Sequence, residues 1–217
     1  MSGRLFAATG LRNRGWAMKK ILLAVALGTV ALAAVGCQAP DWVRFDVHAY
    51  RDNKPGVVTF RGHSGVRADP LLAEERARES AANELADWVL HGEQLESFYS
   101  PDVRANRAFA SMESLIKQFI TDAALESMKN RSLLLDNYSK RRRDRYETTY
   151  EEWVLYGLLR SEIVAILGRA RESLKLHILD KDLGSGKELT RKLTDQTAAF
   201  FDHLAKVVGP PASREAR

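Results

Sequence analysis

Residue types that carry out enzymatic chemistry are scattered through this chain of 217 residues. The five histidines are His48, His63, His91, His177 and His203. None of them belongs to a His-x-x-Glu-His or His-x-x-x-His sequence, the kind of spacing that brings two imidazoles to one metal ion. We therefore expect neither a metal site nor a cofactor.

Two short segments with glycine and serine invite a catalytic interpretation. His63-Ser64 lies between Gly62 and Gly65, yet the sequence is not the Gly-x-Ser-x-Gly of a nucleophile loop, and a turn explains the glycines. The segment Gly184–Lys187 lacks the spacing of a phosphate-binding loop, and no strand precedes it. We interpret it as a linker between two helices.

Adjacent carboxylates are the remaining candidates for acid–base chemistry. Glu151-Glu152 precedes an apolar run, so we interpret the pair as solvated charges in a turn before a strand. General acid or base catalysis needs a desolvated cleft, which the sequence does not indicate. We expect a non-catalytic protein.

Cys37 is the only cysteine. A disulfide within the chain is therefore impossible, as is a zinc site with more than one thiolate. A lone thiol in an exported protein would be exposed to oxidation, so we expect Cys37 to be buried or chemically occupied.

The segment before Cys37 has the features of an export signal. Met18-Lys19-Lys20 is followed by Ile21–Gly36, sixteen residues without a charge. A transmembrane helix needs about 20 apolar residues, so this run is marginal as a span. Its proportions and its small terminal residues are those of a signal peptide, residues 18–36. Residues 1–17 are interpreted as a start-site artefact, because Met18 opens a leader of normal length.

The end of this leader resembles the bacterial lipobox in the sequence Ala34–Cys37. In such signals the cysteine thiol is diacylated, the bond equivalent to Gly36–Cys37 is cleaved, and the new amino terminus is usually acylated. Ala34 departs from the favoured leucine but is a tolerated substitute. The alternative is an uncleaved signal anchor in which Cys37 is incidental. Gln38 is not the aspartate that retains many lipoproteins in the inner membrane, so the resemblance implies the outer membrane, facing the periplasm.

The basic character of the chain lies in the leader. The formal net charge is +5, but residues 1–36 hold five of the 33 basic residues and no acidic residue. The remaining chain has 28 basic and 28 acidic residues and is neutral. A neutral domain does not steer phosphate backbones toward itself, which argues against nucleic-acid binding.

The mature chain predicts an α+β fold: helices packed on a small antiparallel sheet, with additional C-terminal helices. Residues 37–56 are expected to form the lipidated cysteine and a tether, and 57–160 the α+β domain. Residues 161–208 should form C-terminal helices packed on it, and 209–217 a disordered tail.

Helix signals occur at four places. Asp69-Pro70 should cap a helix that ends near His91-Gly92 and carries an alanine face for close packing. Ser100-Pro101 should start a second helix that continues through Ala123. Ser161 should cap a third, and a last helix should run to Val208 before Gly209.

Few strands are expected. Residues 57–60 form a short β-type run that Gly62 should halt, and alternation from Leu133 leads to the basic run Lys140–Arg143, a solvated strand face or turn. Residues 153–159 are nearly all apolar, so we expect burial on both faces, with Gly157 allowing a close approach.

The tryptophans of the mature chain suggest separate roles. Trp88 and Trp153 fit core positions on a helix and a strand. Trp42 lies shortly after the anchor. It could dock the tether onto the domain, lie at the lipid interface, or be partly buried at the start of the fold.

The order of these features resembles the Lpp-twenty lipoprotein family, which is related to the amino-terminal domain of the flagellar assembly protein FlgT. The likeness rests on the lipoprotein leader, Pro40–Val43, the alanine-rich helix 73–90, the segment 136–140 and the strand 153–159, and covers about residues 40–160. It implies helices against an antiparallel sheet and carries over no catalytic residue. The helices after Ser161 exceed the family's usual extent.

The leading hypothesis is a lipid-anchored envelope module that binds the membrane through its N-terminal lipid and an envelope protein through its domain. The alternatives are an accessory subunit of a flagellar or secretion-type machine, and an envelope hydrolase with dispersed catalytic residues.

Overall fold

The computed structural model describes residues 39–44, 56–183 and 186–209. The chain divides into two units, Met1–Pro40 and Asp41–Arg217. All the helices and strands described below belong to the second unit.

The sheet has three antiparallel strands in the order β1-β3-β2. They are β1 (Val57–His63), β2 (Leu134–Arg143) and β3 (Thr148–Leu159). The central strand is β3, the most apolar segment, because only a strand with neighbours on both sides can be covered so completely. In the register of the sheet, Tyr156 of β3 lies opposite Phe60 of β1, and Trp153 of β3 lies opposite Tyr138 of β2.

Gly62 does not halt β1, contrary to the expectation from the sequence. The strand runs through it to His63, and an ideal Cβ at Gly62 would lie 1.7 Å from the carbonyl oxygen of Ala77. The glycine is therefore needed because a helix backbone crosses the strand here, not because the chain turns.

The first long helix is α3 (Pro70–Leu90), and it lies against β1 and β3. Asp69 caps it as expected, since Oδ1 accepts hydrogen bonds from the backbone N–H groups of Leu71 and Leu72. The helix ends at Leu90, before Gly92 at φ +80°, as the sequence predicts. Small side chains on its inward face let it approach the sheet closely. That face is mostly alanine: Ala73, Ala77, Ala81, Ala82, Leu85, Ala86 and Val89.

The expected single helix from Ser100 to Ala123 is wrong. The chain forms η2 (Leu95–Phe98), α4 (Pro101–Arg104) and η3 (Arg107–Ser111) before α5 (Met112–Met128) begins. Asn106 interrupts the helical path because its side chain accepts a hydrogen bond from the Ala108 N–H and so caps a new turn.

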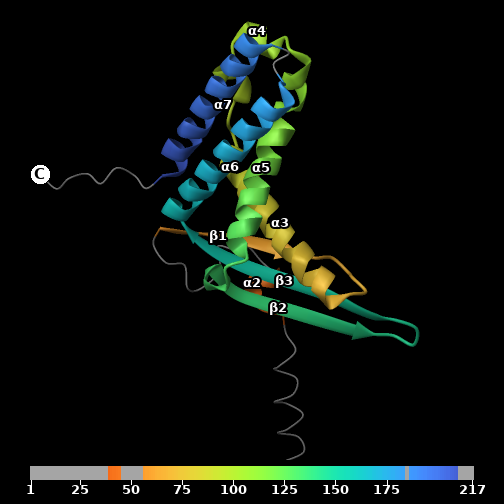
Figure 1. Cartoon of the computed structure of the whole chain (residues 1–217). Coiled ribbons are helices and arrows are strands. Elements are labelled where there is room, and N and C mark those ends of the chain that lie inside the picture. The colour runs from red at the N-terminus through yellow and green to blue at the C-terminus, as the bar shows by residue number, and fades with distance from the viewer. Residues whose placement is uncertain (1–38, 45–55, 184–185, 210–217) are drawn as a thin grey trace, which may run out of the picture. The chain divides into compact units, whose positions relative to one another are not determined.

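Two further long helices complete the domain, α6 (Arg160–Lys181) and α7 (Lys187–Val208). Figure 1 shows α5, α6 and α7 side by side above the sheet, with α5 packing on α6 and α6 on α7. The expectation that Ser161 caps α6 is wrong. The helix begins at Arg160, and the Glu162 carboxylate accepts a hydrogen bond from the Leu159 N–H instead.

The main core lies between these helices and one face of the sheet, to which Phe60, Tyr156 and Leu158 contribute. Trp88 does not lie in its interior, contrary to the expectation from the sequence. Its side chain is 38% exposed and covers the edge of Phe60, with ring centroids 5.8 Å apart. The fold is α+β, with helices on a small antiparallel sheet and additional C-terminal helices, which confirms the predicted class.

Candidate functional site

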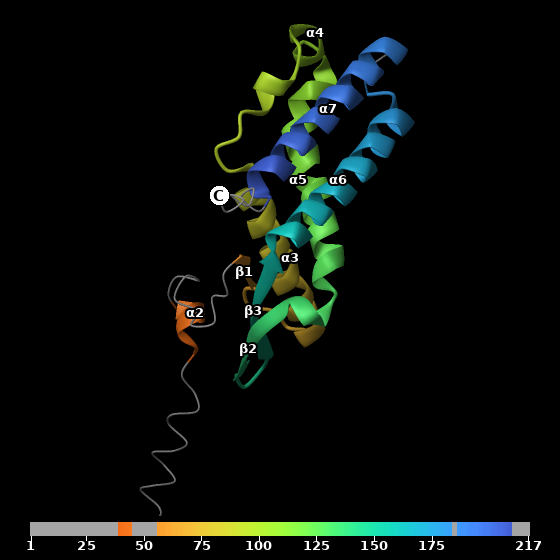
Figure 2. The ribbon, with the colours of Figure 1, turned by 90° about the vertical axis from the view of Figure 1, so that its left-hand side faces the viewer.

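The face of the sheet that points away from α3 carries a second apolar cluster. We call it the open face: the outward side chains of β1, β2 and β3 together with α2 (Asp41–Arg44). Figure 2 shows α2, in orange, on one side of the sheet and α3 and α5 on the other. Trp42 and Leu155 are buried in this cluster, and Val43, Tyr138 and Trp153 pack against them.

Trp42 fastens α2 to the open face by contacts of several kinds. Its side chain is 3% exposed, and its indole N–H donates to Asp136 Oδ2 over 2.8 Å. Its backbone carbonyl accepts a hydrogen bond of 3.2 Å from the Arg61 guanidinium. The segment closest to Cys37 in the described ranges is therefore docked on the domain. Of the three roles considered for Trp42, the structure shows docking.

Aromatic rings extend this cluster along the sheet. The His63 imidazole stacks on Trp153 with ring centroids 4.5 Å apart and planes 13° apart, and Tyr138 lies 5.4 Å from Trp153. Burial lowers the pKa of His63, although the nearby Glu151 raises it. Trp153 is thus a partly buried member of the open face, not of the main core.

The two adjacent glutamates have different surroundings, and the expectation that both are solvated turn charges is wrong. Both lie inside β3, on opposite faces. Glu151, on the open face, lies 3.9 Å from the Lys140 ammonium and 3.7 Å from the Arg142 guanidinium. Glu152 points to the other face, and its backbone N–H donates to the Ser64 hydroxyl.

Glu152 belongs to a polar groove of about 500 Å³ between β2, β3 and the start of α3. Its carboxylate accepts hydrogen bonds from the Ser139 hydroxyl and, over 3.5 Å, from the Asn137 amide. Burial raises the pKa of Glu152, and these two hydrogen bonds partly offset that shift. Across the groove, Arg78 pairs with Glu74 over 2.7 Å, while its Nε has no hydrogen-bond partner in the part of the chain that the structure describes.

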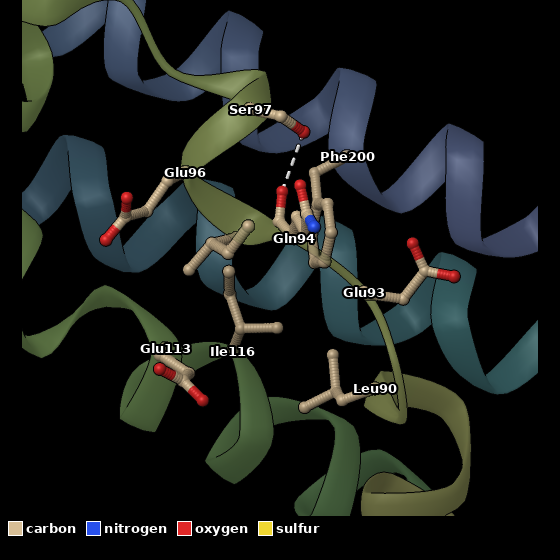
Figure 3. Close-up of a pocket in the computed structure, with 9 residues that line it drawn as sticks. Leu90, Glu93, Gln94, Glu96, Ser97, Glu113, Ile116 and Phe200 are labelled. Carbon is tan, nitrogen blue, oxygen red and sulfur yellow. Dashed lines mark hydrogen bonds between the residues drawn. The ribbon is translucent and has the colours of Figure 1, made fainter.

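A second cavity, of about 310 Å³, lies where η2 meets α5 and α7 (Figure 3). Figure 3 shows the Ser97 hydroxyl bonded to the Gln94 carbonyl, at 2.7 Å. Glu93 is also held by His203 Nε2 at 2.9 Å. The cavity offers an apolar floor and an acidic rim, which suits binding better than nucleophilic chemistry. Its apolar lining includes Leu90, Leu95, Ile116 and Phe200, and its carboxylates are Glu93, Glu96 and Glu113.

The remaining motifs singled out in the sequence have structural explanations or lie outside the described residues. Gly36 and Cys37 lie outside them, as does Ser185 in the glycine-rich linker. The turn predicted for this segment is wrong for Gly62 and His63, which lie within β1. Ser64, directly after the strand, is 3% exposed and its hydroxyl donates to the Gly65 carbonyl. Lys187 is the first residue of α7.

Across residues 39–44, 56–183 and 186–209, no group of three or more His, Cys, Asp or Glu side chains could hold a metal ion. None of the helices in these ranges combines the length and apolarity needed to cross a membrane.

Comparison with known proteins finds no matching family model, no matching curated protein and no matching solved structure. The resemblance to the Lpp-twenty family stays a prediction from the sequence.

Proposed function

We propose that this chain is a lipid-anchored, non-catalytic lipoprotein of the bacterial envelope, acting as an interaction or assembly module in the periplasm. The observation that carries the proposal is the sequence Ala34–Cys37 at the end of a short apolar leader. Its cysteine is the only one in the chain, so a single modification would account for it. Two or more acyl chains give durable membrane attachment, at about 0.8 kcal/mol per buried methylene, whereas one chain binds marginally.

The docking of Trp42 means that a lipid on Cys37 would be joined to the domain by a short linker. Trp42 lies five residues after Cys37, and five residues span at most about 18 Å when fully extended. An anchored domain would therefore be held close to the bilayer, because the linker between the lipid and the docked Trp42 is short. Such a short connection suits a module that meets its partner near the membrane surface.

The interaction role is supported by apolar side chains that the fold leaves exposed. On α6, Leu176 is 66% exposed and Leu179 is 49% exposed. They are three residues apart, so they are neighbours on the helix surface. A pair of leucines facing outward suits protein contact better than catalysis.

Metabolic labelling with a fatty-acid analogue tests the anchor. The wild-type chain should incorporate the label, and Cys37→Ser should not. Gln38→Ser is a matched control, because it changes the next residue and keeps the thiol, and it should label like the wild type. Label in the Cys37→Ser variant would refute lipidation at this cysteine.

Membrane fractionation tests the location. The wild-type chain is expected in the outer-membrane fraction, and Gln38→Asp should move it to the inner-membrane fraction. A wild-type chain that fractionates with the inner membrane would refute the outer-membrane assignment while leaving the lipid anchor standing.

Site-specific photocrosslinking in cells tests the interaction role. A photoreactive residue at Leu179 should give one adduct of defined mass. The same residue at the exposed Lys181, also on α6 but turned away from the two leucines, should give much less. Recovery of the uncrosslinked monomer alone from both positions would count against a partner on this face of α6.

A further inference from the structure

The β2–β3 hairpin concentrates positive charge in a mature chain whose formal charges sum to zero. From Arg141 to Glu147 every residue is exposed. Glu151 partly compensates Lys140 and Arg142, but Arg143 and Arg145 lie beyond its reach at the tip. The end of the hairpin, residues 140–147, is therefore a local cationic site. Residues 140–147 contain five basic residues, Lys140, Arg141, Arg142, Arg143 and Arg145, and two acidic ones, Asp144 and Glu147.

The strand β2 carries both the contact with the segment nearest Cys37 and, further along, the basic end of the hairpin. Lys140 and Arg142 share the open face with Trp42, whereas Arg141 and Arg143 point to the other face. Trp42 contacts β2 at Asp136, Tyr138 of β2 packs against the same cluster, and β2 continues from there to Arg143. Five strand residues span about 17 Å, which is close to the greatest reach from Trp42 back to Cys37. A lipid inserted in the membrane through Cys37 would therefore allow the end of the hairpin to reach the membrane surface.

The side chains at this end suit a lipid surface. Tyr146 at the tip of the hairpin is 95% exposed, the most exposed of the large hydrophobic side chains in the described ranges. Tyrosine and tryptophan favour the headgroup region, because their rings are apolar and their polar ends reach water. The planar guanidinium of arginine can donate two parallel hydrogen bonds to one phosphate group, which suits arginine for binding phospholipid headgroups.

Resting on the proposed lipid anchor, we propose that the open face is directed toward the membrane and that the tip of the β2–β3 hairpin, Arg143–Tyr146, binds anionic phospholipid headgroups. The anchor supplies attachment, and the hairpin sets the orientation. The helix α4, at the end of the domain far from the sheet in Figure 1, then faces away from the bilayer and toward partners.

The absence of other cysteines in the mature sequence makes this orientation measurable. In Tyr146→Cys the new thiol is the only free one when Cys37 is acylated, so it can carry an environment-sensitive fluorophore. Ala105→Cys, in the exposed segment after α4, is the matched control position. The acylated full-length mature protein is reconstituted in vesicles of neutral phosphatidylcholine, with and without anionic phosphatidylglycerol.

The expected result is a shift of the label at position 146 to shorter wavelength in anionic vesicles, with several-fold stronger quenching by a lipid-borne quencher. The label at position 105 should not respond. Arg143→Glu with Arg145→Glu should abolish the response, whereas Arg104→Glu with Arg107→Glu, an equal charge change at the far end, should leave it intact. Salt at about 1 M, where the Debye length is about 3 Å, should also abolish it.

The outcomes separate the two proposals. Mass spectrometry and flotation with neutral vesicles are read first, and a chain without acyl groups would overturn the anchor and this inference together. An acylated chain that floats, but whose label at position 146 responds no more than the label at 105, would overturn the inference alone. A response equal in neutral and anionic vesicles would also overturn it, because headgroup charge would then play no part.

Discussion

The Trp42 indole donates a hydrogen bond of 2.8 Å to Asp136 Oδ2 and so joins residues 94 positions apart in the chain. One partner lies in α2, the described helix nearest Cys37 in the sequence, and the other lies in the edge strand β2. The bond holds the entry of the chain against the open face, where Leu155 is wholly buried beneath it.

The contribution of this contact can be measured by substitution. Trp42→Phe keeps an aromatic ring but removes the donor, and we expect a loss of about 1 kcal/mol in the free energy of unfolding. Trp42→Ala should cost about 3 kcal/mol, because Leu155 is also uncovered. Urea denaturation of the mature chain, followed by circular dichroism, checks both. Asp136→Asn keeps an acceptor oxygen and should cost less than either; a cost equal to that of Trp42→Ala would contradict this account.

Gly62 and Gly168 are a matched pair for testing the crossing of α3 over β1. Gly62→Ala would place a methyl group against the Ala77 carbonyl oxygen, since an ideal Cβ lies only 1.7 Å from it. We expect a loss of about 3 kcal/mol or more. At Gly168, within α6, no neighbouring atom of the described residues lies within 4 Å of an ideal Cβ, so Gly168→Ala should stabilise the protein by about 0.5–1 kcal/mol. Thermal unfolding of both variants measures these changes in stability. A Gly62→Ala variant as stable as the wild type would contradict the close contact between Gly62 and the backbone of α3.

Tyr99 links stability to alkaline pH. Its hydroxyl lies 2.9 Å from Thr197 Oγ1, and burial raises its pKa to about 12. Because the unfolded phenol ionises near pH 10, the native state binds more protons between about pH 10 and 12. Stability should therefore fall by about 2 kcal/mol across that interval. Absorbance of phenolate against pH should show a component near pH 12 that Tyr99→Phe removes, and its persistence in that variant would contradict the assignment.

Glu152 links stability to mildly acidic pH with the same sign. Burial raises the pKa of this carboxyl, so the native state favours the protonated form more than the unfolded state does. The contribution of Glu152 to stability is thus greatest below its unfolded pKa and declines as the pH rises through the folded pKa. Glu152→Gln should flatten this decline and be at least as stable as the wild type at about pH 7. Denaturant midpoints between about pH 4 and 7 measure it; an unchanged pH profile in the variant would show that another group is responsible.

Local signals account for the parts of the fold that the sequence predicted well. The Asp69 cap, the proline after it and the alanine repeat specify α3 within one stretch of chain, and the apolar run 153–159 specifies the buried strand. The second helix failed because Asn106 competes for the backbone locally, a capping option that hydrophobic spacing does not reveal. The alternation of side chains along a strand explains the different surroundings of Glu151 and Glu152, since neighbouring residues point to opposite faces of the sheet.

By itself the sequence determined the α+β class and predicted the leader, its boundary at Cys37 and the neutrality of the mature chain, because each is written in consecutive residues or in composition. Only the tertiary structure decided that Trp42 docks on Asp136, that Gly62 meets the backbone of α3, and that Lys140 and Arg142 of β2 share a face of the sheet with α2. These relationships join distant parts of the chain. They depend on strand order, register and helix crossing, which are set by how the whole core packs.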